Sequence, residues 1–354
     1  MREFLAEWRP VVDGAIEEVL PREVSAADLQ EGFGPATFEY DQAGVQRSVV
    51  DPVWELLDRG GKRWRPVLFL TLLEAFGTDP EAYLEYATVP ELLHTGTILV
   101  DDIEDGAELR RGGPAIHHEY GVDVALNAGN ALYFLPLRVL ADDPGNLSAE
   151  QRLRAFEMLG EELARTHLGQ GVDIDWHGDP PADPDEAAYL ELCACKTGCL
   201  ARIVARLAAI VAGRPVEDER AVARYAELLS VGFQIHDDVL DVEHTLGRAG
   251  DFGKAFGNDV REGKTTLVVI HALSALSPDD ADHLRAVLAD DDPSDDDVLA
   301  VVEYLTTTDS VGYARERAAE LTADALDALE AVALEPEPAE RLREFATFVV
   351  ERDA

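Results

Sequence analysis

The sequence predicts an all-α fold, organised as one large helical bundle. Apolar and charged residues recur with a helical period, most clearly at 201–210, 220–231 and 313–333. Alternating strand patterns and Asn-Gly hairpin signals are nearly absent. Proline and glycine concentrate between the helical segments, as at 141–145 and 179–184. We therefore expect many helices joined by loops.

The chain is expected to form a single domain over residues 1–354, because we find neither a repeat of fixed period nor a domain-scale linker. The stretch 334–338 contains two prolines and indicates a break before a last helix. The acidic region 278–297 is expected to form solvated loops or helix ends.

The balance of charge is strongly acidic. Asp and Glu number 71 against 30 Lys and Arg, which gives a formal net charge of -41. Such a chain repels nucleic-acid backbones, so nucleic-acid binding is not expected. Dense salt screens self-repulsion, so this composition indicates a salt-rich cytoplasm; an ordinary acidic protein is the alternative.

The amino terminus has neither a basic region nor a long apolar run, and the apolar stretch 67–73 is too short to span a membrane. We expect a cytoplasmic protein without a membrane span.

The three cysteines, Cys193, Cys195 and Cys199, lie close together in sequence. On a helix only Cys195 and Cys199 would share a face, and no neighbouring residues complete a tetrahedral metal site. We expect them to be buried small hydrophobic residues.

Two aspartate-rich segments carry the strongest chemical signal. They run from Asp101 to Asp105 and from Asp237 to Asp241, and each follows an apolar run. In a helix the first and last aspartates of each segment lie one turn apart on one face. Carboxylates gathered in this way repel one another unless a cation or water separates them, and oxygen ligands suit Mg²⁺. A solvated acidic helix end is the alternative for either segment alone.

Lysine occurs only four times, and each lysine lies in a short polar motif. The four are Lys62 in a Gly-Gly-Lys sequence, Lys196 before Thr197, and Lys254 and Lys264, each after a glycine. This concentration indicates a site for an anion such as diphosphate.

Taken in order, these motifs resemble those of the trans-isoprenyl diphosphate synthases, the head-to-tail prenyltransferases, over about residues 56–270. The resemblance implies a bundle of the isoprenoid-synthase type with a central active-site cavity. It also implies Mg²⁺-dependent condensation of isopentenyl diphosphate with an allylic diphosphate, with three Mg²⁺ ions bound beside the allylic substrate.

The resemblance assigns the site residues in three groups. The metal ligands, which with Lys196 and Arg110 form the catalytic set, are Asp101, Asp102, Asp105, Asp237, Asp238 and Asp241. The contacts to isopentenyl diphosphate are Lys62, Arg65, His94 and Arg111. The contacts to the allylic diphosphate are Arg110, Lys196, Thr197, Gln234, Lys254 and Lys264. The stretch Gly169-Gln170-Gly171-Val172-Asp173 resembles a further family signature on the bundle wall.

The resemblance also implies that the growing tail runs beside the helix of the first segment, where a bulky residue four or five places before Asp101 stops it early. Gly96 and Thr97 stand there and are small, which argues against a fifteen-carbon product. One turn further back, Leu93 and Pro90 could form the floor at which the tail stops.

The chain looks most similar to geranylgeranyl diphosphate synthases, so we expect a twenty-carbon product, with a twenty-five-carbon product as the alternative. Together with the acidic composition, this similarity suggests that the protein comes from a salt-adapted archaeon. Asn130 stands where many relatives have aspartate, and residues 25–48 have no clear counterpart.

Two other functions are compatible with parts of the pattern. A class I terpene cyclase shares the first aspartate segment, but the second segment and Lys62, Arg65 and His94 argue against it. A non-catalytic regulatory subunit would typically lack part of the metal or diphosphate set, and none is missing here. The resemblance also implies a homodimer.

Overall fold

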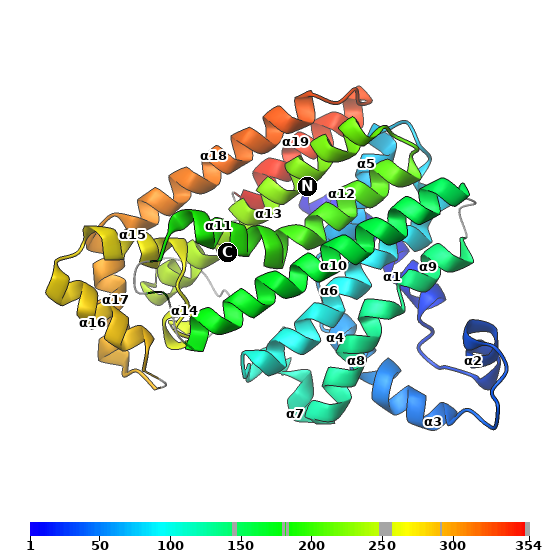
Figure 1. Cartoon of the computed structure of the whole chain (residues 1–354), viewed down its shortest axis with the longest axis horizontal. Helices are drawn as coiled ribbons and strands as arrows, with labels where there is room; N and C mark the ends of the chain where they lie inside the picture. Colours follow the sequence, from blue (N-terminus) through cyan, green and yellow to red (C-terminus); the bar gives the residue numbers. More distant parts are fainter. Residues whose placement is uncertain (144–146, 179–180, 182–183, 248–256, 291, 351–354) are drawn as a thin grey trace. The chain divides into compact units, whose positions relative to one another are not determined.

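The computed structural model describes the chain apart from residues 144–146, 179–180, 182–183, 248–256, 291 and 351–354, and helices dominate it (Figure 1). The predicted all-α class is confirmed. The described residues divide into two compact units, of which the first comprises Met1–Met158 with Ile210–Gly213 and the second Leu159–Ala209 with Arg214–Ala354. Two helices, α10 (Ala149–Gly178) and α12 (Cys199–Val211), contribute residues to both. The single domain remains a prediction.

The first unit contains the amino-terminal helices. In chain order its remaining elements are α1 (Arg2–Val19), α2 (Ala26–Phe33), α3 (Gln42–Val45), the π-helix η1 (Gln46–Val50), α4 (Asp51–Asp58), α5 (Trp64–Ala75), the 3₁₀-helix η2 (Pro80–Tyr83), α6 (Leu84–Glu104), the strands β1 (Leu109–Arg110) and β2 (Gly113–Pro114), α7 (Ile116–Tyr120), α8 (Val122–Phe134) and α9 (Leu137–Asp142). The stretch 25–48 thus holds α2, α3 and the start of η1.

Helix α6 is the centre of the first unit, where it packs against α1, α5 and α8. Its closest approach to α8 is made by two glycines. A Cβ added to Gly96 would lie 2.9 Å from the carbonyl oxygen of Gly129, and one added to Gly129 would lie 3.1 Å from that of Gly96. The two backbones therefore meet at a point where larger residues do not fit.

A short antiparallel pair of strands follows α6. Leu109 lies opposite Pro114, and Arg110 lies opposite Gly113. The two turn residues, Arg111 and Gly112, have φ values of 52° and 78°, the positive values that a tight two-residue hairpin turn requires. Strands of two residues are too short to show alternation, so the sequence gives no sign of them.

The second unit contains the remaining helices. After the carboxyl-terminal part of α10 they are α11 (Glu186–Cys193), the π-helix η3 (Ala194–Gly198), α12, α13 (Val216–Thr245), α14 (Asn258–Arg261), α15 (Leu267–Ala275), α16 (Pro278–Leu288), α17 (Asp295–Thr307), α18 (Ser310–Glu330) and α19 (Pro336–Val350). Helix α13 packs along α18, drawn in orange in Figure 1, and against η3.

Buried ion pairs join three helices of the second unit. Arg202 of α12 donates from Nε and Nη2 to Glu162 of α10, at 2.9 and 2.7 Å, and from Nη1 to Glu227 of α13. Arg206 also donates to Glu162, at 2.7 Å. Burial alone would raise the pKa of Glu162, but these arginines outweigh it and hold the pKa below its ordinary value.

Several expectations about local structure are confirmed. Helix α19 begins at Pro336, within the stretch 334–338 where a break before a last helix is expected. The acidic region forms helix starts, with Ser277 capping α16 and Ser294 capping α17 ahead of exposed aspartates. All three cysteines are buried.

One described stretch, Val122–Asp142, is long and apolar enough to cross a membrane by length and composition alone, and 39% of it is buried within the protein. It comprises α8 and α9, and α8 packs against α6. Core helices of soluble proteins pass the same test, so we assign this stretch to the helical bundle.

Removing Glu162 should strongly destabilise the protein. The Glu162→Ala change removes the buried carboxylate shared by the buried guanidinium of Arg202 and the partly exposed guanidinium of Arg206, and we expect the free energy of unfolding to fall by about 3–5 kcal/mol. Glu161→Ala is the matched control, because Glu161 is exposed where it pairs with Arg206, and its loss should change stability by less than about 1 kcal/mol. Denaturant unfolding at constant salt measures both, and equal effects would contradict the buried network.

Candidate active site

The first aspartate segment lies at the end of α6. The N–H of Asp105 donates to the carbonyl of Asp101 at 2.8 Å, so these two residues lie one turn apart on a partly exposed face, as the spacing predicts. Asp102 points inward and is 1% exposed. Its Oδ1 accepts a hydrogen bond from Arg110 Nε at 2.7 Å. Burial raises the pKa of Asp102, and Arg110 partly offsets the rise.

The chemistry of this segment fits a cation such as Mg²⁺. The second oxygen of Asp102, Oδ2, is buried and has no hydrogen-bond partner among the described residues. Within the described part of the chain, no three His, Cys, Asp or Glu side chains lie close enough to hold a metal ion by themselves. A Mg²⁺ ion that keeps several waters and bridges to a ligand phosphate needs only one or two carboxylates.

The Gly-Gly-Lys loop precedes α5, and three of its residues have positive φ. Gly60 and Gly61 have φ values of 119° and 122°, and Arg63 has φ 51°. Arg63 is only 2% exposed; its guanidinium donates to Asp13 at 2.7 Å, to Glu91 at 3.0 Å and to the Leu57 carbonyl at 2.9 Å. These contacts to α1, α6 and α4 fix the loop that carries Lys62.

The side chain of Arg111 is held against the Gly-Gly-Lys loop. Its Nη1 donates to the carbonyl of Gly60 at 2.7 Å and to that of Leu56 at 3.1 Å. Burial, together with repulsion from Arg63 and Arg110, lowers the pKa of Arg111. The turn residue with the left-handed backbone thus brings its side chain to the Gly-Gly-Lys loop.

Arg65 and His94 belong to the same cluster of positive charge. Burial, with repulsion from Arg111, lowers the pKa of Arg65 to about 10, so its guanidinium stays charged at neutral pH. Burial and repulsion from Arg65 and Arg111 lower the pKa of His94 far enough that its ring is neutral there. His94 Nδ1 has no hydrogen-bond partner among the described residues. Arg65, His94 and Arg111, three of the four residues expected at isopentenyl diphosphate, therefore form one cluster with a surplus of positive charge, which an anion would compensate.

The residues expected to limit chain length take different positions on α6. Gly96 is buried against α8, where its added Cβ would lie 2.8 Å from Leu132 Cβ. Thr97 is partly exposed, on the side of α6 that carries Asp101 one turn later. Leu93 is fully buried one turn before Thr97. Thr97 and Leu93 therefore share the face expected to line the tail, whereas the tight contact of Gly96 is with α8.

Lys196 and Thr197 lie in η3, the π-helical turn of the second unit. Lys196 Nζ pairs with Asp173 Oδ2 of α10 at 2.5 Å. The Thr197 hydroxyl lies 3.4 Å from Gln234 Oε1 of α13. Three of the residues expected at the allylic diphosphate are thus brought close together within this unit.

The second aspartate segment lies within α13, and its three carboxylates have different surroundings. Asp237 is partly exposed, whereas Asp238 and Asp241 are buried. Asp238 accepts from Gln234 Nε2 at 3.0 Å and from the Tyr189 hydroxyl at 2.5 Å. Asp241 Oδ2 accepts from the backbone N–H of Asp259 at 3.2 Å. Two of the three expected metal ligands are therefore engaged with protein groups.

The remaining lysines follow the second segment. Lys264 pairs with Glu262 and lies 3.9 Å from Asp259 Oδ1. Lys254 lies outside the described residues, and its assignment stays a prediction.

Several residues that build these sites were missed by the sequence analysis. Arg63 lies at a variable position of the Gly-Gly-Lys motif, so the motif assigned it no role. A sequence signal did exist, because Glu91 is a lone carboxylate within an apolar helix and so indicated a buried basic partner. Tyr189 and Asp259 carry no sequence signal of their own, because only the folded chain brings them to Asp238 and Asp241.

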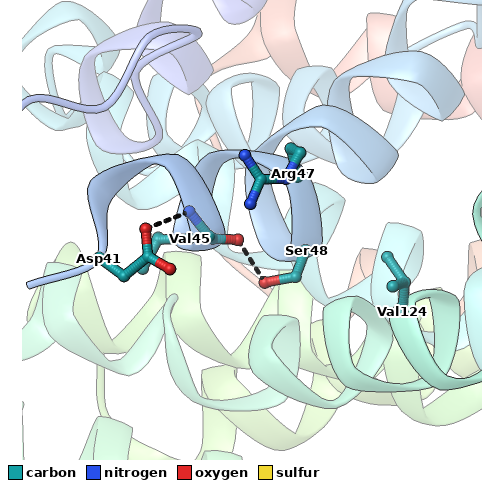
Figure 2. Close-up of a pocket in the computed structure, with 6 residues that line it drawn as sticks. Asp41, Val45, Arg47, Ser48 and Val124 are labelled. Carbon is teal, nitrogen blue, oxygen red and sulfur yellow. Dashed lines mark hydrogen bonds between the residues drawn. The ribbon is translucent and has the colours of Figure 1, made fainter.

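A pocket of about 520 Å³ lies elsewhere in the first unit, lined by Asp41, Gly44, Val45, Arg47, Ser48 and Val124 (Figure 2). None of the expected site residues lines it. The Asp41 carboxylate accepts from the Gly44 N–H at 2.9 Å, and the Ser48 hydroxyl donates to the Gly44 carbonyl at 2.7 Å. These two polar groups therefore stabilise local turns of the chain.

Comparison with known proteins defines the class. The profile of the polyprenyl synthetase family matches residues 46–305, and the chain belongs to this family. It is a prenyltransferase, a head-to-tail isoprenyl diphosphate synthase acting on isoprenyl diphosphates. Among its relatives, a geranylgeranyl pyrophosphate synthase of Geoglobus acetivorans is 34% identical over 84% of this chain and 88% of its own. A geranylfarnesyl diphosphate synthase of Natronomonas pharaonis is 31% identical over the same shares.

Solved structures agree with this assignment. A geranylgeranyl pyrophosphate synthetase from Pyrococcus horikoshii matches with a TM-score of 0.84 and 27% identity, over 99% of this chain and 98% of its own. A geranylgeranyl pyrophosphate synthase from Corynebacterium glutamicum, in complex with isoprenyl diphosphate and magnesium, matches with a TM-score of 0.79 and 26% identity, over 96% and 99% of the chains.

The packing of Gly96 predicts a change in stability. Gly96→Ala places a methyl group 2.8–2.9 Å from Leu132 and Gly129, and we expect the free energy of unfolding to fall by about 1–3 kcal/mol. Gly14→Ala in α1 is the control, because an added Cβ there meets nothing within 4 Å. Denaturant unfolding measures both variants. Unchanged stability in Gly96→Ala would contradict the tight crossing of α6 and α8.

Proposed function

We propose that this enzyme makes geranylgeranyl diphosphate, the twenty-carbon product. One observation carries the proposal. On the face of α6 that bears Asp101, the residue one turn back is the small Thr97, and one turn further back is the buried Leu93. A tail starting at the diphosphate would pass Thr97 and meet Leu93, and each helical turn advances about 5.4 Å.

Geranylfarnesyl diphosphate is the second candidate. It is favoured by the small size of Thr97 and by the name of the Natronomonas pharaonis relative. The two products differ by one five-carbon unit. The depth below Thr97 at which a side chain stops the growing tail therefore distinguishes them.

Magnesium would be held by the partly exposed carboxylates Asp101, Asp105 and Asp237, with Asp102 Oδ2 as a further oxygen. The proposed number of ions is three. When bound, Mg²⁺ supplies charge neutralisation for the allylic diphosphate. The magnesium present in the Corynebacterium glutamicum complex supports this assignment.

The side chains divide the two substrates between them. Lys62, Arg65, Arg111 and neutral His94 would bind isopentenyl diphosphate. The pKa of Arg65, about 10, keeps its guanidinium charged at neutral pH, and the nearby Glu91 pairs with Arg63. Arg110, Lys196, Thr197, Gln234, Lys254 and Lys264 would bind the allylic diphosphate. Their cationic groups stabilise the departing diphosphate, so that the allylic group becomes a carbocation. The double bond of isopentenyl diphosphate attacks it, and the released diphosphate takes the proton that is lost.

We also propose a homodimer in a salt-rich cytoplasm. An exposed apolar stripe on α8, formed by Val122, Leu126 and Phe134, supports the dimer because these side chains are 48%, 39% and 69% exposed on one side of the helix. The net charge of -41 supports the salt-rich compartment.

Product analysis tests the proposed function. The purified protein is supplied with labelled isopentenyl diphosphate, Mg²⁺ and high salt, with dimethylallyl, geranyl or farnesyl diphosphate in separate reactions. We expect a discrete twenty-carbon diphosphate, lost on chelation of the metal. Asp101→Ala and Asp237→Ala should each lower kcat at least about 100-fold while the helical circular dichroism is kept.

Glu104→Ala is the control for the first segment, because Glu104 is exposed beside these carboxylates and has no assigned role. A twenty-five-carbon product would replace the C20 proposal. Near-normal turnover in either aspartate variant would contradict the two-segment mechanism.

Thr97→Phe should shorten the product. A phenyl ring on the tail face, one turn before Asp101, blocks the path toward Leu93, so we expect mainly fifteen-carbon diphosphate. Gly96→Ala is the contrasting variant, since its methyl group meets α8 and should leave the product unchanged. An unaltered product from Thr97→Phe would place the tail elsewhere.

A further inference from the structure

The π-helical turn η3 departs from regular helix at the residues expected to hold the allylic diphosphate. It interrupts the path from α11 to α12 over Ala194–Gly198, with Lys196 and Thr197 inside it. A π-helical turn inserts an extra residue and loosens the regular hydrogen bonding, and such turns persist where the surroundings stabilise them. The contacts around η3 therefore show what sets the positions of Lys196 and Thr197.

Gly169 of α10 lies directly against the backbone of η3. A Cβ at this position would lie 2.6 Å from Lys196 N, 2.7 Å from Cys195 Cβ and 2.8 Å from Cys195 C. Two of these atoms belong to the main chain and cannot rotate away. The absence of a side chain at Gly169 thus fixes how closely α10 and η3 approach.

Ser230 of α13 fixes η3 from another helix. Its hydroxyl donates to the Thr197 carbonyl at 3.2 Å, and the residue is 1% exposed. One turn later, Gln234 lies beside the Thr197 hydroxyl and donates to Asp238, which also accepts from Tyr189. The carbonyl and side chain of Thr197 are therefore both positioned from α13.

Helix α10 also aligns the lysine. Asp173 follows Gly169 by four residues, so it lies one turn further on the same face, and it pairs with Lys196 Nζ. At one end of the segment, Gly169 thus fixes the position of the η3 main chain. At the other end, Asp173 fixes the direction of the Lys196 side chain.

We propose that Gly169 and Ser230 are positioning residues that hold η3 so that Lys196 and Thr197 meet the diphosphate of the allylic substrate. The proposal rests on the proposed function for the identity of that substrate. It gives the Gly169–Asp173 signature a physical role: the glycine admits the turn and the aspartate orients its lysine. Gly169 lies against the main chain of η3, and the buried Ser230 donates to the Thr197 carbonyl, so both would act through η3.

Steady-state kinetics of Gly169→Ala test the proposal. The methyl group must displace the Lys196 main chain, and a displacement near 1 Å can reduce activity about 100-fold. We expect the KM for the allylic diphosphate to rise at least about tenfold, with the KM for isopentenyl diphosphate within about twofold of wild type. Gly160→Ala, on the same helix, is the control, because its added Cβ meets nothing within 4 Å.

Ser230→Ala keeps the test decisive if Gly169→Ala does not fold. It removes one hydrogen bond to the Thr197 carbonyl, and we expect the allylic KM alone to rise about threefold to tenfold. Equal increases for both substrates, or a fall in kcat alone, would overturn the proposal because they would indicate general loosening of the fold.

Binding of inorganic pyrophosphate with Mg²⁺, measured by calorimetry, separates this proposal from the proposed function. If wild type forms no prenyl product, the proposed function fails, and pyrophosphate affinity still tests the geometry. Affinity weakened at least about fivefold in Gly169→Ala and unchanged in Gly160→Ala supports the positioning role. Equal affinity in the two variants, or undetectable binding to wild type, overturns it.

Discussion

The buried guanidinium of Arg63 is the constraint on which the first half of the site depends. Arg63 has a left-handed backbone conformation, and its guanidinium donates hydrogen bonds to the carboxylates of Asp13 and Glu91. Because those carboxylates are engaged there, Arg65 and Arg111 keep a surplus of positive charge. The ion pairs of Arg63 thus do two things: they hold the Gly-Gly-Lys loop in place, and they leave the neighbouring arginines available for an anion.

In the two aspartate segments, buried and partly exposed carboxylates likewise have different surroundings. At the second segment, Asp238 is held by Gln234 and Tyr189, and Asp241 is held to the main chain at Asp259. At the first segment, Asp102 accepts a hydrogen bond from Arg110, whereas Asp101 and Asp105 are partly exposed. In each segment buried carboxylates bind neighbouring protein groups, and the other carboxylates are partly exposed. The repeated Asp-Asp-x-x-Asp pattern therefore combines buried structural positions with partly exposed ones.

Sequence periodicity predicted the part of this arrangement that depends on helical register. The one-turn spacing of Asp101 and Asp105, the shared face of Thr97 and Asp101, and the helix starts at acidic clusters all follow from it. The rest depends on contacts between segments distant in sequence. The π-helical turn at Lys196 packs against Gly169, and the side chain of the hairpin residue Arg111 donates to the Gly60 carbonyl. Neither leaves a periodic pattern in the sequence, so local reasoning could not predict them.

The scarcity of lysine has a structural counterpart in how arginine is used. Arg63, Arg202 and Arg206 each bind more than one acceptor, which a planar guanidinium does with fixed geometry. A lysine ammonium is a compact charge on a flexible stem, and in this chain it occurs only in the four predicted diphosphate motifs. Surface carboxylates, such as those at the starts of α16 and α17, repel one another, and salt screens that repulsion. The ion pairs of the buried Arg63 and Arg202 are screened much less by salt, so high salt can reduce repulsion at the acidic surface while weakening these two sets of pairs little.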